Sequence, residues 1–275
     1  MVLLAGLGTG AENGVERARE LYQRTDYLAA LEILRRLPQQ DFQAALLAGK
    51  CLYGLEQYKQ ASEALEAAVR LAPASSEAHL WLGRAYGRRA ETSSFIAAPG
   101  LASRARQHFE RSLQLDPNNK EAAGDLFEYY LEAPGFLGGG EGKARALAEK
   151  YRDADPAEYH YRLAQLALKK NDVRSAEEHL RKAYELEPDK AGRILDLAAF
   201  LSKQGRFEES DRLFDEAERR APARVWFARA RAYIESRRNL SQARQLLERY
   251  LRAPLTPDDP PRREAERLLK KAEGS

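Results

Sequence analysis

The sequence predicts an all-α solenoid of helical hairpins that ends in a C-terminal capping helix, and an internal repeat carries this prediction. Seven of the twelve prolines close similar phrases, at Pro38, Pro73, Pro117, Pro156, Pro188, Pro222 and Pro254. A small residue precedes the proline by 8 positions in the first phrase, by 12 in the next five and by 11 in the last. Apolar residues also recur at helical spacing inside the phrases, and such regular self-similarity indicates stacked helical units.

Each repeat is predicted to pair two amphipathic helices. The phrase "QASEALEAAVRLAP" places Ala61, Leu65, Ala68 and Leu71 on one stripe, at i, i+4, i+7 and i+10. A second amphipathic segment, such as "HLWLGRAYGRR", precedes the phrase, and a short polar or glycine-containing turn joins the two. Because one hairpin cannot bury its apolar face alone, neighbouring hairpins must stack to form the core.

The repeat register divides the chain into three parts. Residues 1–10 are expected to be an N-terminal tail, residues 11–255 seven repeats, and residues 256–275 a proline-rich linker with the capping helix. The tail combines a short apolar run with small residues, which fits two interpretations. It is either the end of a truncated signal peptide, which implies an exported or periplasmic protein, or the frayed terminus of a cytoplasmic one.

The capping helix is predicted from "DDPPRREAERLLKKAEG". Asp258 or Asp259 would cap it, and Pro260 or Pro261 would open it. Its apolar stripe is Ala265, Leu268, Leu269 and Ala272. We expect this stripe to cover the apolar face of the seventh repeat, which otherwise has no neighbour.

Two repeats contain extra residues. The small residues of the two helices are 12 positions apart in repeats one, two, five and six, but 22 apart in repeat three and 17 in repeat four. The additions predict enlarged turns near 90–101 and 133–142. Each carries Pro-Gly and an apolar pair, Phe95 with Ile96 and Phe136 with Leu137, and we expect these pairs to pack together as a lobe on the rim of the solenoid.

The second enlarged turn, "APGFLGGGEGK", is rich in glycine but does not match a phosphate-binding loop. Leu137 stands where that loop needs its first glycine, and Ala144 follows Lys143 where a serine or threonine should hold magnesium. We interpret the glycines at 138–140 as positions that allow positive φ and a close approach of neighbouring backbone.

The pattern as a whole resembles the tetratricopeptide repeat, a helix–turn–helix of ~34 residues. In the third repeat the resemblance rests on Leu82, Gly83, Tyr86, Ala105, Phe109 and Pro117. In the sixth it rests on Leu197, Ala198, Leu201, Gly205, Phe207, Ser210, Phe214, Ala217 and Pro222. It covers about seven repeats over residues 11–254, and departs from the pattern where repeat one closes early and repeats three and four run long. It implies a right-handed superhelix whose first helices line a concave groove.

The outward residues of those first helices are therefore the candidate peptide-binding groups. They are Arg19, Tyr22, Lys50, Tyr53, Arg84, Arg88, Asp125, Glu128, Glu132, Tyr161, Gln165, Lys169, Phe227 and Arg231. Aromatic rings interleaved with cations suit an extended peptide, because they offer stacking area and charge-assisted hydrogen bonds. The alternative is an ordinary solvated inner face.

Composition and motifs favour binding over catalysis. With 45 basic against 42 acidic residues, the net charge of +3 argues against nucleic acid as a partner. No apolar run is long enough to span a membrane. The four histidines lack metal-ligand spacing, His108 and His179 are expected to be solvated, and no nucleophile elbow occurs. We expect a non-catalytic scaffold or adaptor for a protein or peptide, without cofactor or metal. The alternatives are a helper or regulatory subunit of an envelope enzyme complex, or an enzyme with an unrecognised site.

Overall fold

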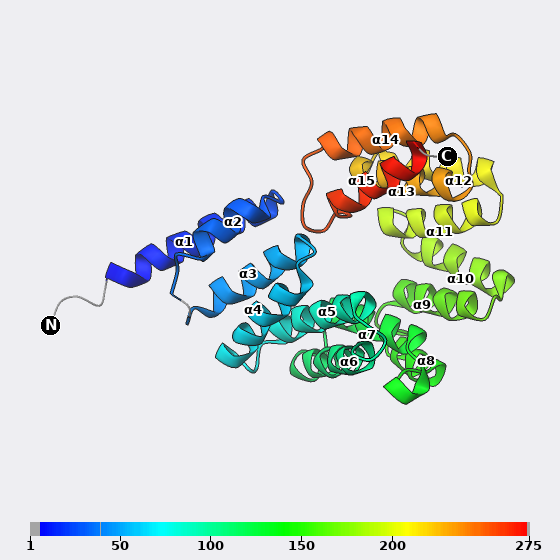
Figure 1. Ribbon diagram of the computed structural model, residues 1–275. Helices are drawn as coiled ribbons and strands as arrows, with labels where there is room; N and C mark the ends of the chain where they lie inside the picture. Colours follow the sequence, from blue (N-terminus) through cyan, green and yellow to red (C-terminus); the bar gives the residue numbers. More distant parts are fainter. Residues whose placement is uncertain (1–5, 39, 274–275) are drawn as a thin grey trace. The chain divides into compact units, whose positions relative to one another are not determined.

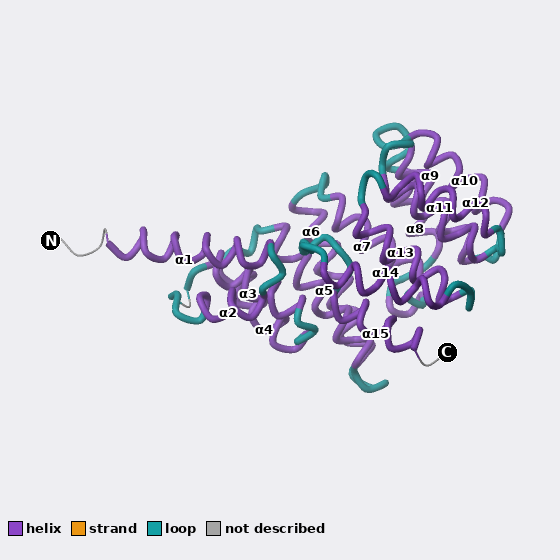
Figure 2. The backbone as a smooth tube through the Cα atoms, turned by 90° about the horizontal axis from the view of Figure 1, so that it is seen from above, coloured by secondary structure: helices purple, strands orange, loops and turns teal. Residues whose placement is uncertain are grey.

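The computed structural model describes residues 6–38 and 40–273, and within them it contains fifteen α-helices, one 3₁₀ helix and no strand (Figure 1). The helices are α1 (Gly6–Gln23), α2 (Tyr27–Leu34), α3 (Phe42–Gly54), α4 (Tyr58–Leu71), α5 (Ser76–Thr92), α6 (Ala98–Leu115), α7 (Lys120–Glu132), η1 (Gly135–Leu137), α8 (Glu141–Glu149), α9 (Pro156–Lys169), α10 (Val173–Leu186), α11 (Ala191–Lys203), α12 (Phe207–Glu218), α13 (Pro222–Glu235), α14 (Leu240–Arg252) and α15 (Arg262–Glu273). The described segments between them are loops and turns (Figure 2). The predicted all-α helical repeat is confirmed.

The chain forms two compact units, Met1–Ala144 and Arg145–Ser275. In unit 1 each second helix packs on the first helix of its hairpin, as α4 does on α3 and α6 on α5, and the first helices α1, α3, α5 and α7 contact one another in succession. In unit 2 the same arrangement joins α9 with α10, α11 with α12 and α13 with α14, while α11 contacts α13. Helix α15 packs on α13 and α14, as expected of a capping helix.

The N-terminal boundary differs from the prediction of a tail over 1–10. Residues 1–5 lie outside the described part of the chain, but α1 already begins at Gly6. No proline interrupts the sequence from there to Gln23, so the backbone hydrogen bonds of the helix continue through the glycines.

The small residue of each second helix is buried where the two helices of a hairpin meet. Ala61, Ala105 and Ala176 are fully buried, and Ser210 and Ala243 occupy the same position in later repeats. On the first helices the approach is equally close: a Cβ added to Gly83 would lie 2.6 Å from the ring of Phe109. The small residues therefore allow the two helices of a hairpin to pack closely.

Five of the hairpin turns share one geometry. The second residue of the turn has positive φ, and the N–H of the third residue donates to the carbonyl five residues before it. Asp26 N–H binds the Leu21 carbonyl in this way, and Gln57 N–H the Leu52 carbonyl, both at 2.9 Å. This is the Schellman arrangement that ends a helix. The positive-φ residues are Thr25, Glu56, Asn171, Gly205 and Arg237. Only one of them is glycine, so four of these turns hold a side chain in the left-handed region.

Thr25→Gly is expected to raise the free energy of unfolding of unit 1 by about 0.5–1 kcal/mol. A β-branched residue in the left-handed region costs about 1–2 kcal/mol, and the greater backbone entropy of glycine in the unfolded chain offsets part of the gain. Denaturant midpoints measure the effect, and Gly205→Thr at the matching turn should move the midpoint in the opposite direction. A lower midpoint for Thr25→Gly would contradict this account.

The enlarged turn of repeat three is shorter than predicted, because its extra residues lengthen both helices. Helix α5 continues to Thr92 and α6 begins at Ala98, which leaves a connection of residues 93–97 instead of 90–101. Pro99 lies in the first turn of α6, where a helix needs no N–H donor, so proline starts the helix rather than breaking it.

The enlarged turn of repeat four has the backbone that its glycines predict. After the single turn η1, Gly138 adopts φ +85° and Gly140 φ +133°. A Cβ on Gly139 would lie 1.9 Å from the carbonyl oxygen of Ala133, so the two backbones approach too closely for any side chain. The ammonium of Lys143 donates to the carbonyl of Gly138 at 2.8 Å, which closes the turn on itself.

The expected apolar packing between the two enlarged turns is not found. Phe95, Ile96 and Phe136 are 93%, 91% and 83% exposed, so their side chains do not bury one another. Leu137 is half-buried, and its carbonyl accepts a hydrogen bond from the Tyr129 hydroxyl at 2.9 Å. The segment η1 packs against α6, and Gly138 lies beside Arg106, so the second turn folds onto the preceding hairpin's helix rather than onto the other turn.

The capping helix matches its predicted stripe but not its predicted N-cap. Ala265 and Ala272 are buried against α13 and α14, with Leu268 and Leu269 packed beside them. The N–H groups of Glu264 and Ala265 bind the carbonyl of Pro261. Asp259 instead accepts hydrogen bonds from the backbone and hydroxyl of Thr256, because the 256–259 turn needs that acceptor before the helix begins.

Candidate binding clefts

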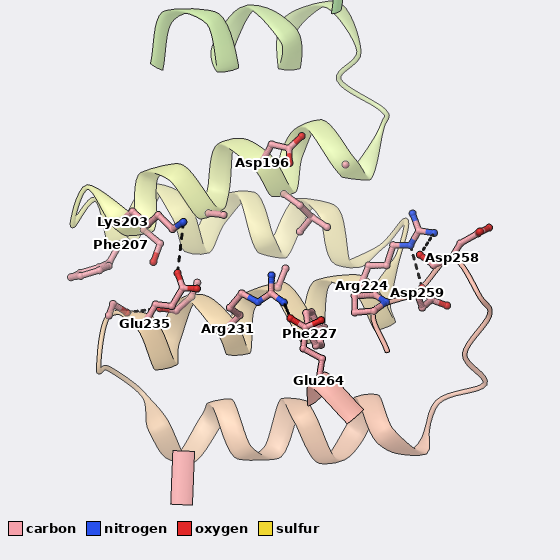
Figure 3. Close-up of a pocket in the computed structure, with 18 of the residues that line it drawn as sticks. Asp196, Lys203, Phe207, Arg224, Phe227, Arg231, Glu235, Asp258, Asp259 and Glu264 are labelled. Carbon is pink, nitrogen blue, oxygen red and sulfur yellow. Dashed lines mark hydrogen bonds and ion pairs between the residues drawn. The ribbon is translucent and has the colours of Figure 1, made fainter. Parts of the chain in front are cut away.

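The C-terminal cleft is a hollow of about 890 Å³ within unit 2, bounded by α11, α13 and the segment that leads into α15 (Figure 3). From α11 it takes Gly192, Leu195, Asp196, Ala199, Ser202 and Lys203. These positions recur every three or four residues, so they form one face of the helix. The matching face of α13 carries Arg224, Phe227, Ala228, Arg231, Ala232 and Glu235. The cleft is thus lined by first helices, as the repeat predicts.

Ion pairs hold the cations of this cleft in place. Arg231 pairs with Glu264 of α15 and lies 4.7 Å from the centre of the Phe227 ring. Arg224 contacts the Asp259 carboxylate at 3.2 Å, and the Lys203 ammonium lies 4.0 Å from Glu235. All three cations of the lining therefore already face a carboxylate of the protein itself.

Asp196 differs from the other carboxyl groups of the cleft. It lies on α11, whereas Glu264 lies on α15 (Figure 3), and its side chain keeps about a third of its surface exposed. Its nearest cation, Arg193, is 3.9 Å away and is bound more closely by Glu158 at 2.6 Å. Because the surrounding protein desolvates it and Arg193 compensates only in part, the pKa of Asp196 is raised to about 7.

The N-terminal groove is a hollow of about 710 Å³ within unit 1, bounded by α5, α6, α7 and the two enlarged turns. Arg84 binds Asp125 at 2.5 Å and Glu121 at 2.9 Å, and Arg88 pairs with Glu91. The Tyr53 ring packs edge-on against Tyr58 and Trp81, and burial raises its pKa to about 12. Phe95 and Phe136 both border this groove.

Contacts in one repeat register link the first helices of unit 1. In α1, α3 and α5, a cationic side chain stands one residue after the small residue of the helix. It contacts a polar group at the start of the first helix of the following hairpin. The contacts are Arg19 to Gln43 at 3.3 Å, Lys50 to Glu77, and Arg84 to Glu121. Lys50 and Arg84 also lie 5.2 and 4.8 Å from the Trp81 ring centre. We call this set the cation ladder.

The structure brings together part of the predicted groove. Tyr53, Arg84, Arg88, Asp125, Glu128 and Glu132 line the N-terminal groove, and Phe227 and Arg231 line the C-terminal cleft. Arg19 and Lys50 border a smaller pocket of about 220 Å³ with Glu77. On α9, Gln165 is half-buried and Lys169 exposed.

Two predicted ligand groups pack against the core instead. Tyr22 is 8% exposed and packs 5.6 Å from Tyr27, because it lies four residues after the buried Ala18 on the same stripe of α1. The Tyr161 ring packs in the core of α9–α11 and lies under the Arg193 guanidinium at 4.9 Å. Phe227, although it borders the cleft, is itself only 3% exposed.

Sequence reasoning missed Trp81 and most of the charged groups of the C-terminal cleft. The missed cleft residues are Asp196, Lys203, Arg224, Glu235, Asp258, Asp259 and Glu264, of which Asp258 and Asp259 are predicted only as possible helix caps. Asp196, Ala199 and Lys203 follow the i, i+3, i+7 spacing of a single helix face, which is the signal that could have identified them.

The histidines form two pairs, which corrects the expectation that His108 and His179 are solvated. His79 and His108 approach at 2.9 Å between their Nδ1 atoms, and His160 and His179 at 3.0 Å. Each pair joins the two helices of one hairpin, with the second histidine three residues after Ala105 or Ala176. In the first pair, the contact of His79 Nε2 with the Pro73 carbonyl at 3.2 Å places a proton on Nε2, so Nδ1 accepts from His108.

Burial lowers the pKa of all four histidines, that of His108 to about 4. No cluster of three or more metal-ligating side chains occurs in the part of the chain that the structure describes. Within the same residues, no helix has the length and apolar character needed to cross a membrane.

Comparisons with known proteins agree with the repeat. Two family models described as tetratricopeptide repeat match residues 46–120 and 167–226. A thermophilic repeat protein of this kind from Thermus thermophilus is 20% identical, with a TM-score of 0.55 over 70% of this chain and 98% of that one. One from Parabacteroides merdae is 12% identical, with a TM-score of 0.58 over 96% and 99%. A part of one from Cytophaga hutchinsonii is 17% identical, with a TM-score of 0.51 over 93% and 99%. No curated protein matches the chain.

Proposed function

Since this chain belongs to the tetratricopeptide repeat family, a class of protein-interaction scaffold, we propose that it is a non-catalytic scaffold that holds an extended segment of a partner protein in the C-terminal cleft. A fold does not by itself assign a function, so the proposal rests on the cleft. The observation that carries it is Asp196, a residue that lines the cleft and whose carboxyl group has only a distant, shared cation beside it.

The chemistry of the cleft favours a lysine or arginine of the partner at this position. The cleft's own cations are engaged by Glu235, Asp259 and Glu264, so they do not compete for Asp196. A cation placed against a partly desolvated carboxylate forms a charge-assisted hydrogen bond, which is stronger than a neutral one. The apolar surface of Leu195 and Ala228 lies in the same cleft and suits the aliphatic stem of such a side chain.

Asp196→Asn is expected to weaken binding of a lysine- or arginine-containing peptide about tenfold, because a hydrogen bond to a charged group contributes about 1.5–3 kcal/mol. The probe is a set of peptides of about ten residues that differ only at the central position, which is Lys, Arg, Gln or Glu. Asp153→Asn, an exposed aspartate of the same unit, serves as the control and should leave affinity unchanged.

The same titration should depend on pH. Because the pKa of Asp196 is raised to about 7, the carboxylate that binds a cation predominates only above neutral pH. Affinity should therefore increase from pH 6 to pH 8 in the wild type and stay level in Asp196→Asn. Equal affinity for the Lys and Glu peptides, or an unchanged affinity in Asp196→Asn, would refute the proposal.

A further inference from the structure

The N-terminal groove has an exposed aromatic rim. Phe95 and Phe136 come from different hairpin turns and border one groove, and Ile96 stands next to Phe95. These three are the most exposed large apolar side chains of the described residues. Below them the groove is lined by apolar groups of Ala98, Pro99, Ala102, Phe109, Pro134 and Leu137. Grouped apolar side chains in solvent mark a surface that another molecule covers.

The turns that carry these rings are held by hydrogen bonds. In the second turn, Gly140 N–H donates to the Tyr130 carbonyl at 2.8 Å, and Tyr129 and Lys143 bind the carbonyls of Leu137 and Gly138. In the first, the N–H groups of Ala97 and Ala98 both donate to the Ser94 carbonyl at 3.0 Å. Because the backbone is already fixed, a ligand does not have to order it, which favours binding.

The groove also has an excess of negative charge. Its lining includes four carboxylates, Glu91, Asp125, Glu128 and Glu132, but only two cations, Arg84 and Arg88. Both cations already contact carboxylates. The whole chain carries a net charge of +3, so this negative charge is a local property of the groove.

Glu128 lies at the centre of this negative charge. Although its side chain reaches solvent, the walls of the groove desolvate the carboxyl group in part, and the carboxylates of Asp125, Glu132 and Glu91 add repulsion, so its pKa is raised. A positive charge beside Glu128 would relieve that repulsion.

We propose that the N-terminal groove binds an amphipathic, cationic segment of a partner protein, whose apolar side chains cover Phe95 and Phe136 and whose lysine or arginine pairs with Glu128. The negative groove favours this ligand over an anionic lipid surface, because its carboxylates would repel the headgroups. The site lies wholly within unit 1 and is independent of the C-terminal cleft.

The test uses an amphipathic peptide of about 14 residues built from Leu and Lys as the probe, with a Leu/Glu peptide of the same pattern for comparison. Binding to the full chain is measured by fluorescence anisotropy at physiological salt. The chain carries Asp196→Asn, so that peptide binding at the C-terminal cleft does not contribute to the signal. The Leu/Lys peptide should bind and the Leu/Glu peptide should not. The double variant Phe95→Ser, Phe136→Ser should lose at least tenfold in affinity, and Glu128→Gln should lose several-fold.

Leu28→Ser is the matched control, because Leu28 is also a large exposed apolar residue of unit 1 but lies on α2, away from the groove. It should leave the affinity unchanged. Three results would overturn the proposal: equal affinity for the two peptides, equal losses in Leu28→Ser and the double phenylalanine variant, or phenylalanine-dependent binding to phosphatidylserine vesicles without binding to the peptide. Failure of the cleft experiments with Asp196→Asn would leave this result standing.

Discussion

Ala265→Asp is expected to lower the free energy of unfolding of unit 2 by about 3 kcal/mol or more. Ala265 is fully buried where α15 meets α13 and α14, in a cluster with Phe227, Leu247 and Tyr250. A carboxylate there would lose its hydration without a prepared partner, which costs several kcal/mol unless the group is neutralised. Denaturant unfolding measures the loss, and a displaced α15 would also expose the cluster and promote association, which light scattering detects.

Glu266→Asp provides the control, because the next residue of the same helix is exposed and an aspartate there should be tolerated. If Ala265→Asp unfolded at the same denaturant concentration as the control, α15 would not be the cover of the seventh repeat that the packing indicates.

Acidification is expected to remove the stabilising contribution of the two histidine pairs. The pKa values of all four histidines are lowered in the folded chain, while the unfolded chain titrates near 6.5. The unfolded state therefore binds more protons below that pH, so the contribution is fully present above about 6.5 and is lost as the pH falls toward the folded values, about 4 for His108. Protonation of His79 on Nδ1 would also set two N–H groups against each other.

The measurement compares the wild type with the double variant His108→Gln, His179→Gln at each pH. The variant should be less stable at pH 7.5, and the difference should shrink by about 2 kcal/mol by pH 5, after allowance for the partial exposure of the rings. The comparison is needed because Asp196, with its raised pKa, acts in the opposite direction and cancels in the difference. A difference that stays constant with pH would show that the pairs do not titrate.

Charged groups around the pairs shift the midpoint of this transition without changing its direction. Glu66 favours protonation of His108, whereas Arg104 opposes it and Arg111 opposes it at His79. Around the second pair, Glu178 and Asp172 favour protonation, and Lys182 and Arg145 oppose it.

The hairpins could be predicted because their spacing is a local property of the sequence. A small residue such as Ala61 or Ala176 must stand at a fixed distance from the next turn, whichever residues surround it. The function of an outward position could not be predicted in the same way. Tyr22 is predicted to lie on the outward face, yet its place four residues after Ala18 puts it in the core.

The features that escaped prediction depend on contacts between distant segments. That Asp196 lines a cleft follows from how α11, α13 and the start of α15 are arranged. That Arg84 is already held by Asp125 follows from the stacking of α5 on α7, so the apparent free cation of the sequence is a structural one. The histidine pairs had a signal in the repeat register, since each second histidine stands three residues after the small residue of its helix.

The cation ladder gives the hairpins of unit 1 a direction. Each presents a polar acceptor toward the preceding first helix and a cation toward the following one, as Gln43 with Lys50 and Glu77 with Arg84 do. Surfaces that match head to tail can be extended without limit. A tandem duplication of the second or third hairpin would therefore find a partner for its charges at both seams. A hairpin added after α7 would be less favourable. There Glu128 occupies the position of the cation, so it would meet the acidic start of another copy.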